Sequence, residues 1–180
     1  MLYIFLAEGF EEVEALTVVD LLRRAKCDIT SVSITGNKAV CGSHGITVMA
    51  DALYEEVNFD NAKMLILPGG MPGTTNLQAH AGLPALLKEK HAQGVMLAAI
   101  CAAPMVFAQL GLLNGEKATI YPAMKDELEN AIYSENMVVK SRNNIITSRG
   151  PGTAMYFALA LIEELKGTEM MEHIKEGVLL

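Results

Sequence analysis

The chain has 180 residues, and 51% of them are hydrophobic, which is enough apolar material for one full core without a second domain. Its 21 Asp and Glu residues outnumber its 14 Lys and Arg residues, which excludes the basic surface expected of a nucleic-acid-binding protein. We expect a single domain over residues 1–180.

The amino-terminal segment and the cysteines bear on location. Residues 1–7 are apolar, but they lack a positively charged start and run directly into Glu8–Glu12, which no secretory signal peptide would carry. No apolar run reaches the ~18 residues that span a membrane. The three cysteines are an odd number without tight pairing, which fits a reducing compartment. The sequence therefore predicts a cytoplasmic protein with free thiols and with no membrane or nucleic-acid partner.

Strand-like and helix-like segments alternate along the chain, which is typical of an α/β domain with a mostly parallel sheet. In chain order we expect a strand over 2–7, a helix over 11–25, a strand over 29–35, a hairpin within 38–49, a strand over 64–67 and a helix from 73 to about 92. A buried strand and a helix follow on either side of Cys101. Next come short strands near 117–120, 136–140 and 144–147, a long helix over 153–166 and a tail helix after Gly167.

Ligands of such a domain bind outside the carboxyl ends of the parallel strands, near the topological switch point. Four loops are expected to converge there. These loops are Glu8–Glu14, Pro68–Gly73, Cys101–Ala103 and Arg149–Thr153.

Cys101 lies where the apolar run Gly94–Ile100 meets the alanine-rich segment 102–108. A buried strand followed at once by a helix places the cysteine on a sharp turn, the geometry of a nucleophile elbow. Amides at a helix start stabilise an anion, so a thiol here is expected to titrate as a reactive thiolate. The alternative is a buried structural cysteine, because the G-x-S-x-G signature is absent and Ala99 and Ala103 take the flanking positions.

Glu14 is a candidate proton carrier. It lies one turn before Val18, on the same face of the expected first helix as the apolar residues. A carboxyl in an apolar site has a raised pKa and can share a proton with a neighbouring thiolate or act as a general acid or base. The alternative is that Glu11, Glu12 and Glu14 only complement the positive end of the helix dipole, and Glu11 faces nearly the same way as Glu14.

The loop Pro68–Gly73 carries backbone amides to the same edge. Gly69 and Gly70 either donate these amides to an oxyanion, as in hydrolase-like elbows, or form a plain turn after a strand. The loop lacks the lysine of a phosphate-binding loop, which disfavours a nucleotide site.

None of the four histidines lies near Cys101 in the sequence. His44 follows Cys41 with two residues between them, but this spacing alone is a poor metal signal, because structural zinc needs four regularly spaced ligands. His80, His91 and His173 fall in or around predicted surface helices. The sequence therefore predicts no metal site and no cofactor.

Several segments in order carry a resemblance over nearly the full length. They are Glu8–Ala15, Val19–Ala25, Leu67–Gly70, Ala98–Pro104, Tyr133–Asn136 and Thr147–Ala154. On these segments the chain resembles the ThiJ/PfpI superfamily, in the branch of the parkinsonism-associated deglycase (DJ-one) and its bacterial relatives. The resemblance implies a flavodoxin-like three-layer α/β/α sandwich, related to the class I glutamine amidotransferase domain, that forms a homodimer.

The resemblance also implies roles for single residues. Cys101 matches the oxidation-sensitive nucleophile of the family, and Glu14, rather than Glu11, matches a protonated glutamate hydrogen-bonded to it. Gly70 and Ala102 match the residues whose amides hold an oxyanion.

Other positions match the family in part. Arg24 and Arg149 match family arginines near the dimer interface and the pocket. The branch often carries a histidine where Tyr121 stands here, so the resemblance does not supply a Cys-His-acid triad. A family arginine in the hairpin is replaced around His44, which weakens any inference of anion binding there.

Together with these residues, the resemblance implies cysteine-dependent detoxification of a small aldehyde, such as methylglyoxal or glyoxal, or of glycated substrates. Cys101 attacks the carbonyl, Glu14 moves the proton, and Gly69, Gly70, Ala102, Tyr121 and Arg149 surround the substrate. The alternative is a non-enzymatic oxidative-stress sensor or holding chaperone, which needs only the reactive thiolate. A cysteine peptidase or amidase ranks third, because it requires a histidine base near the cysteine.

Overall fold

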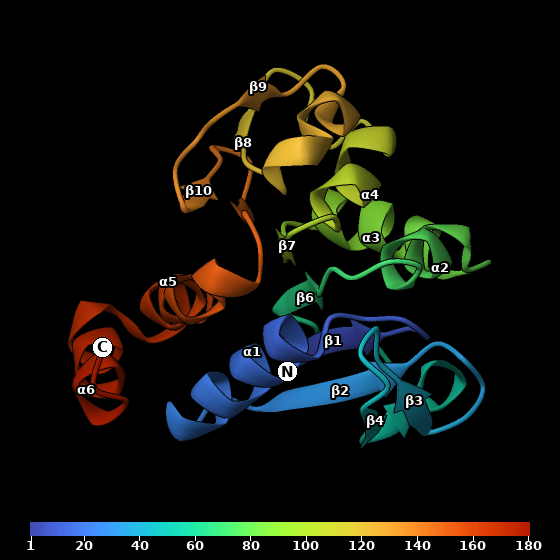
Figure 1. Ribbon diagram of the computed structural model, residues 1–180, viewed down its shortest axis with the longest axis horizontal. Helices are drawn as coiled ribbons and strands as arrows, with labels where there is room; N and C mark the ends of the chain where they lie inside the picture. The colour runs from blue at the N-terminus through green and yellow to red at the C-terminus, as the bar shows by residue number, and fades with distance from the viewer.

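The computed structural model describes all 180 residues, and a seven-stranded sheet forms its centre (Figure 1). The strands are β1 (Leu2–Leu6), β2 (Ile29–Ser33), β5 (Ala52–Leu53), β6 (Met64–Leu67), β7 (Met96–Ile100), β10 (Val138–Lys140) and β11 (Ile145–Ser148). They lie in the order β10-β11-β7-β6-β1-β2-β5, and only β10, at one edge, is antiparallel to its neighbour. The predicted α/β class with a mostly parallel sheet is confirmed.

The order of the strands is the flavodoxin-like one. Counted along the chain, β1, β2, β6, β7 and β11 lie side by side as 2-1-3-4-5, so the winding reverses between β1 and β6. Every residue of β1 and β6 is buried, because both faces of these strands are covered. In folds of this kind, ligands bind at the carboxyl ends of the strands where the winding reverses, here β1 and β6.

Helices cover the two faces of the sheet (Figure 1). On one face α1 (Glu12–Arg24) and α5 (Ala154–Lys166) pack on the side chains of Ile4, Ile66 and Ile100, and α6 (Thr168–Gly177) packs against α5. On the other, α2 (Gly73–Ala79), α3 (Leu83–Ala92) and α4 (Pro104–Gln109) pack on neighbouring strand positions such as Phe5 and Leu67. Alternate strand residues thus feed two separate cores, as period-2 geometry requires. No helix has both the length and the apolar character needed to cross a membrane.

Smaller elements decorate the sheet. β3 (Ala39–Cys41) and β4 (Thr47–Met49) form the predicted hairpin, and β8 (Lys117–Ala118) pairs with β9 (Ile132–Tyr133). Short 3₁₀ turns are η1 (Tyr54–Glu56), η2 (Pro122–Leu128) and η3 (Pro151–Thr153).

Three sequence-based expectations need correction. The helix expected from 73 to 92 is two helices, because the ring nitrogen of His80 accepts the N–H groups of Gly82 and Leu83 and starts a new helix there. The strand expected over 29–35 ends at Ser33, whose hydroxyl accepts the N–H of Thr35 and begins a turn. Strands β5 and β9 were not expected, and each is only two residues long.

Candidate active site

The loops that leave the carboxyl ends of β1, β6 and β7 meet at the switch point. The N–H of Glu11 donates to the Gly69 carbonyl at 2.9 Å, which ties the loop after β1 to the loop after β6. A Cβ placed on Gly69 would lie 2.6 Å from the Cys101 Cβ and 2.6 Å from Glu14 Oε2. Gly69 therefore lies between the cysteine and the glutamate, and there is no room for a side chain at this position.

Cys101 occupies the turn between β7 and α4. Its φ of 64° lies in the left-handed region, which costs a residue other than glycine about 1–2 kcal/mol. The turn is held from two sides, because the Cys101 N–H donates to the Ser148 carbonyl at 3.0 Å and the Tyr121 N–H donates to the Cys101 carbonyl at 2.8 Å. The side chain is half-buried. A strained cysteine between a strand and a helix has the geometry of a nucleophile elbow.

Glu14 lies in the first turn of α1 and is fully buried. Its Oε2 accepts the Gly69 N–H at 2.8 Å, whereas Oε1 has no conventional hydrogen-bond partner and is free to carry a proton. Glu11, which faces a similar direction in the sequence pattern, instead lies beside Ser43 and His44. The structure thus separates the two carboxyls that the spacing alone left equivalent.

Glu14 and Cys101 titrate as a pair. Burial raises the pKa of Glu14 to about 7, although hydrogen bonds with Cys101 and Gly69 act in the opposite direction. Burial also raises the pKa of Cys101 to about 12, and the charge of an ionised Glu14 adds to this rise. Burial and an ionised Glu14 both oppose a thiolate at Cys101, so the reactive thiolate expected from the sequence requires Glu14 to carry the proton.

Backbone amides surround the sulfur of Cys101. The N–H groups of Ala102 and Gly70 interact with the sulfur and favour its thiolate form. Gly70 has a φ of +90°, and a Cβ on it would lie 2.4 Å from the Glu11 nitrogen, so only glycine fits here. The Gly69 amide, in contrast, is occupied by Glu14. Of the two glycines, Gly69 orients the glutamate and Gly70 is directed at the sulfur.

Tyr121 and Arg149 lie beside the elbow. Tyr121 is 45% exposed, and its ring lies over Gly150, where a Cβ would stand 3.4 Å from the ring edge. Arg149 donates from Nη1 to the Glu135 carbonyl at 2.9 Å and forms no ion pair with a carboxylate. Arg24, which the resemblance relates to the dimer interface, lies on the surface of α1 and pairs with Asp20 at 2.7 Å.

Glu12 is a residue whose role the sequence pattern did not reveal. Its side chain is buried, and Oε1 accepts the N–H groups of His44 at 2.8 Å and Ile46 at 3.3 Å, while Oε2 lies 3.0 Å from His44 Nδ1. Burial opposes ionisation of Glu12, but these hydrogen bonds outweigh it and lower the pKa to about 2. Glu12 thereby clamps the β3–β4 hairpin to the start of α1.

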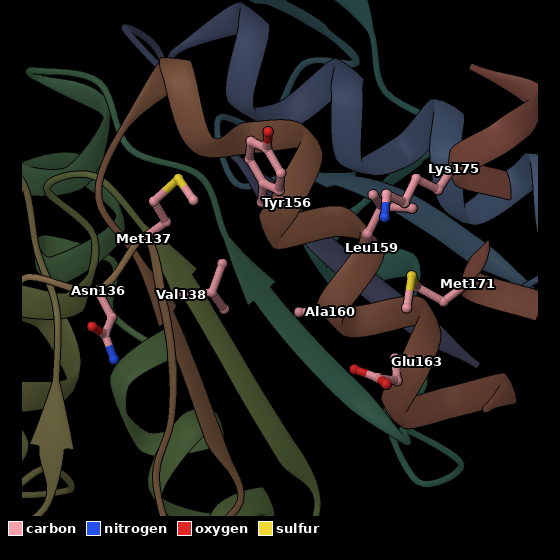
Figure 2. A pocket seen from close by; sticks show the side chains of 9 residues that line it. All are labelled: Asn136, Met137, Val138, Tyr156, Leu159, Ala160, Glu163, Met171 and Lys175. Atoms are coloured by element: carbon pink, nitrogen blue, oxygen red, sulfur yellow. The ribbon is translucent and has the colours of Figure 1, made fainter. Parts of the chain in front are cut away.

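A prominent hollow on the molecule lies away from Cys101. It has a volume of about 500 Å³ and lies between β10, α5 and α6 (Figure 2). Apolar side chains such as Met137, Leu159 and Met171 line most of it, with Glu163 and Lys175 at its polar positions. No side chain predicted for catalysis faces it, so this hollow does not define the candidate active site.

The overall fold is that of a known family. The model of the DJ-1/PfpI family matches residues 1–164, and the chain belongs to this family. It is 38% identical to Protein dj-1beta of Drosophila melanogaster over 98% of this chain and 95% of the relative.

Two further comparisons are informative. The solved structure described as Toxoplasma gondii DJ-1, oxidized, has a TM-score of 0.94 and 39% identity, and covers 99% of this chain and 97% of that chain. A relative from Caenorhabditis elegans named glutathione-independent glyoxalase DJR-1.2 is 32% identical over 90% of this chain and 86% of its own.

Proposed function

We propose that the chain is a cofactor-free enzyme that removes small reactive carbonyls such as methylglyoxal and glyoxal, free or as adducts with thiols and amines. The observation that carries the proposal is Glu14, a fully buried carboxyl with a pKa near 7 beside Cys101. Such a group exchanges protons at neutral pH, which a carbonyl isomerisation requires. The name of the Caenorhabditis elegans relative supports the same class of reaction.

In the first step Glu14 carries the proton and Cys101 is the thiolate. The sulfur attacks the aldehyde carbon of methylglyoxal, a C–S bond forms, and the carbonyl electrons move to the oxygen. The amides of Gly70 and Ala102 stabilise this oxyanion, which takes up a proton to give a hemithioacetal.

In the second step Glu14, now ionised, removes the proton from the former aldehyde carbon, and a proton returns to the neighbouring ketone carbon. The hydroxyl proton on the first carbon passes to the oxygen of the former ketone, so the aldehyde carbon is oxidised to a thioester and the ketone is reduced to an alcohol. Water then cleaves the thioester to release lactate and the Cys101 thiol. The net reaction is methylglyoxal plus water to lactate, and it needs no external oxidant or reductant.

Tyr121 and Arg149 have proposed roles in substrate binding. A phenol and a guanidinium beside the elbow can donate hydrogen bonds to the second carbonyl oxygen of the substrate. Tyr121 stands where the family often has a histidine, so the site lacks an imidazole base and turnover is expected to be slow.

The test is methylglyoxal consumption and lactate formation by wild-type protein, Cys101→Ser and Glu14→Gln. Cys27→Ser is the matched control, because it removes a half-buried thiol at the other end of α1. We expect both site variants to lose at least a hundredfold in kcat while the control retains activity. Equal, near-blank rates in all four proteins would refute the enzyme assignment.

A second candidate function is oxidative-stress sensing or a holding-chaperone activity controlled by Cys101. It is favoured by the protonated carboxyl next to the sulfur, which can donate a hydrogen bond to a sulfinate oxygen. In this reaction one equivalent of hydrogen peroxide converts the thiolate to sulfenate and a second converts it to sulfinate, with release of water each time. Mass mapping after mild peroxide tests it, and oxidation on Cys27 or Cys41 instead of Cys101 would contradict it.

Peptidase or amidase activity ranks third, because the histidines make contacts elsewhere. His44 lies against Glu12, His80 against Tyr54, and His91 interacts with the Asn143 carbonyl. His173 lies on α6.

We also propose a homodimer and a cytoplasmic location. The dimer is supported by exposed apolar residues on one face of α1, Val13 and Leu16, and by an adjoining hollow lined by Met155, Val178 and Leu179. Light scattering after gel filtration tests the dimer. Leu16→Glu is expected to give a monomer, whereas Ile132→Glu, on a different surface, leaves the dimer intact. A wild-type monomer would refute the dimer.

The three free cysteines support a reducing compartment and with it the proposed cytoplasmic location.

A further inference from the structure

Lysines from three separate segments of the chain line a hollow at the amino ends of the sheet strands. It has a volume of about 220 Å³ and lies where the chain enters β1, β2 and β6 and leaves α5. Lys26, Lys63 and Lys166 line it, with Asp28 as the one acidic residue. Leu2 and Leu165 provide apolar walls. This hollow lies at the amino ends of the strands, whereas Cys101 follows the carboxyl end of β7, so the hollow is separate from the candidate active site.

The charge of these lysines is not neutralised within the protein. Ion pairs hold seven of the 14 Lys and Arg residues, and Lys26, Lys63 and Lys166 are not among the seven. The whole chain carries a formal charge of −7, so a local group of three free ammonium groups runs against its overall balance. A concave site in which three lysines outnumber the single Asp28 attracts an anion.

The backbone at this hollow also departs from the usual pattern. Lys26 follows the end of α1 with a φ of 53°, in the left-handed region where helix ends favour glycine. A lysine in this place retains a charge at the hollow despite an unfavourable backbone conformation. The neighbouring Cys27 is half-buried on the wall of the hollow. Burial raises the pKa of its thiol, and the positive charge of Lys166 acts in the opposite direction.

We propose that this lysine hollow binds a small anion that carries a phosphate group. Lysine is a common phosphate ligand, and three ammonium groups match the charge of a phosphate dianion better than that of a single carboxylate. The volume corresponds to about seven water molecules at ~30 Å³ each, which accommodates a phosphate with a short organic group against Leu2 and Leu165. The proposal does not depend on carbonyl chemistry at Cys101.

The direct test is calorimetric titration of the full chain with inorganic phosphate and with glycerol phosphate, at constant ionic strength set by potassium chloride. The variant Lys26→Gln, Lys63→Gln, Lys166→Gln removes the site. The matched control Lys88→Gln, Lys117→Gln, Lys125→Gln removes the same charge from lysines that form no ion pair and lie outside the hollow. We expect at least tenfold weaker binding in the first variant and less than a twofold change in the control. Equal weakening in both, or no binding to the wild type, overturns the proposal.

Cys27 gives a second, independent readout. In a Cys101→Ser background, the alkylation rates of Cys27 and Cys41 are measured with the anionic reagent iodoacetate and with the neutral reagent iodoacetamide. The ratio of the iodoacetate rate to the iodoacetamide rate should be higher for Cys27 than for Cys41. Phosphate should slow alkylation of Cys27 and leave Cys41 unchanged. Cosedimentation with phosphatidate vesicles separates a lipid headgroup from a free phosphate compound as the source. Absence of phosphate protection at Cys27 contradicts the site, and because Cys101 is absent here, failure of the proposed enzyme function would not produce that result.

Discussion

The raised pKa of Glu14 predicts how the free energy of unfolding depends on pH. Its pKa rises from 4.5 to about 7 in the folded protein, and each pKa unit corresponds to 1.36 kcal/mol, so the folded state disfavours the ionised form by about 3 kcal/mol. Between pH 4.5 and 7 the folded chain holds a proton that the unfolded chain has lost. The contribution of Glu14 is therefore fully present below pH 4.5 and is lost as the pH rises through about 7.

Replacing Glu14 by Gln removes this dependence while preserving an acceptor for the Gly69 N–H. We expect the unfolding free energy of the variant to increase relative to that of wild type as the pH rises. The difference between the two should change by about 3 kcal/mol between pH 4.5 and 8. Urea unfolding followed by far-UV circular dichroism is the assay, because the chain has no Trp for fluorescence.

Glu8→Gln is the matched control, since it removes from the same loop a carboxyl that accepts the Cys41 N–H and is not among the causes of the raised pKa of Glu14. The effect assigned to Glu14 is the part of the pH-dependent change in unfolding free energy that exceeds the change seen with the control variant. Parallel pH profiles for wild type and Glu14→Gln would refute the raised pKa and with it the proton role of this residue.

Three further predictions concern the same edge of the sheet. Without the negative charge of Glu14, the pKa of Cys101 falls, so iodoacetamide should modify Cys101 faster in Glu14→Gln than in wild type at pH 8–9; an equal or slower rate contradicts the coupling. Gly69→Ala forces a methyl group against the sulfur and the carboxyl, and should cost about 1–3 kcal/mol and most of the activity; wild-type turnover would show that the contact is not required. His44→Ala removes a hydrogen bond to Glu12, so the pKa of Glu12 rises and acid unfolding should begin at a higher pH. An unchanged acid transition argues against the role of Glu12 in holding the hairpin.

The sequence pattern was sufficient to predict the mostly parallel sheet and the turn at Cys101, and the resemblance added the three-layer arrangement. Continuous apolar runs such as Met64–Leu67 indicate strands covered on both faces, and the structure buries all four residues. The run ending at Ile100, followed by small residues, indicated the turn at Cys101. Local signals of this kind lie within a few residues of the feature they predict.

The remaining features depend on contacts that local patterns do not encode. Glu12 binds the hairpin 32 residues away, and its place in an acidic first turn gave no sign of that contact. The joint titration of Glu14 and Cys101 depends on Gly69, which the fold inserts between them. The lysine hollow combines residues from positions 26, 63 and 166, and no spacing rule connects these positions.

The first turn of α1 holds two buried glutamates of opposite acidity. Glu12 has a pKa of about 2 and Glu14 one of about 7, so between these values the first is an anion and the second a neutral acid. Mild acidification of the cell to pH 5 would load the reactive centre fully with its proton while the hairpin anchor stays charged. At that pH the carboxyl beside the sulfur is protonated while the contact between Glu12 and the hairpin stays ionic.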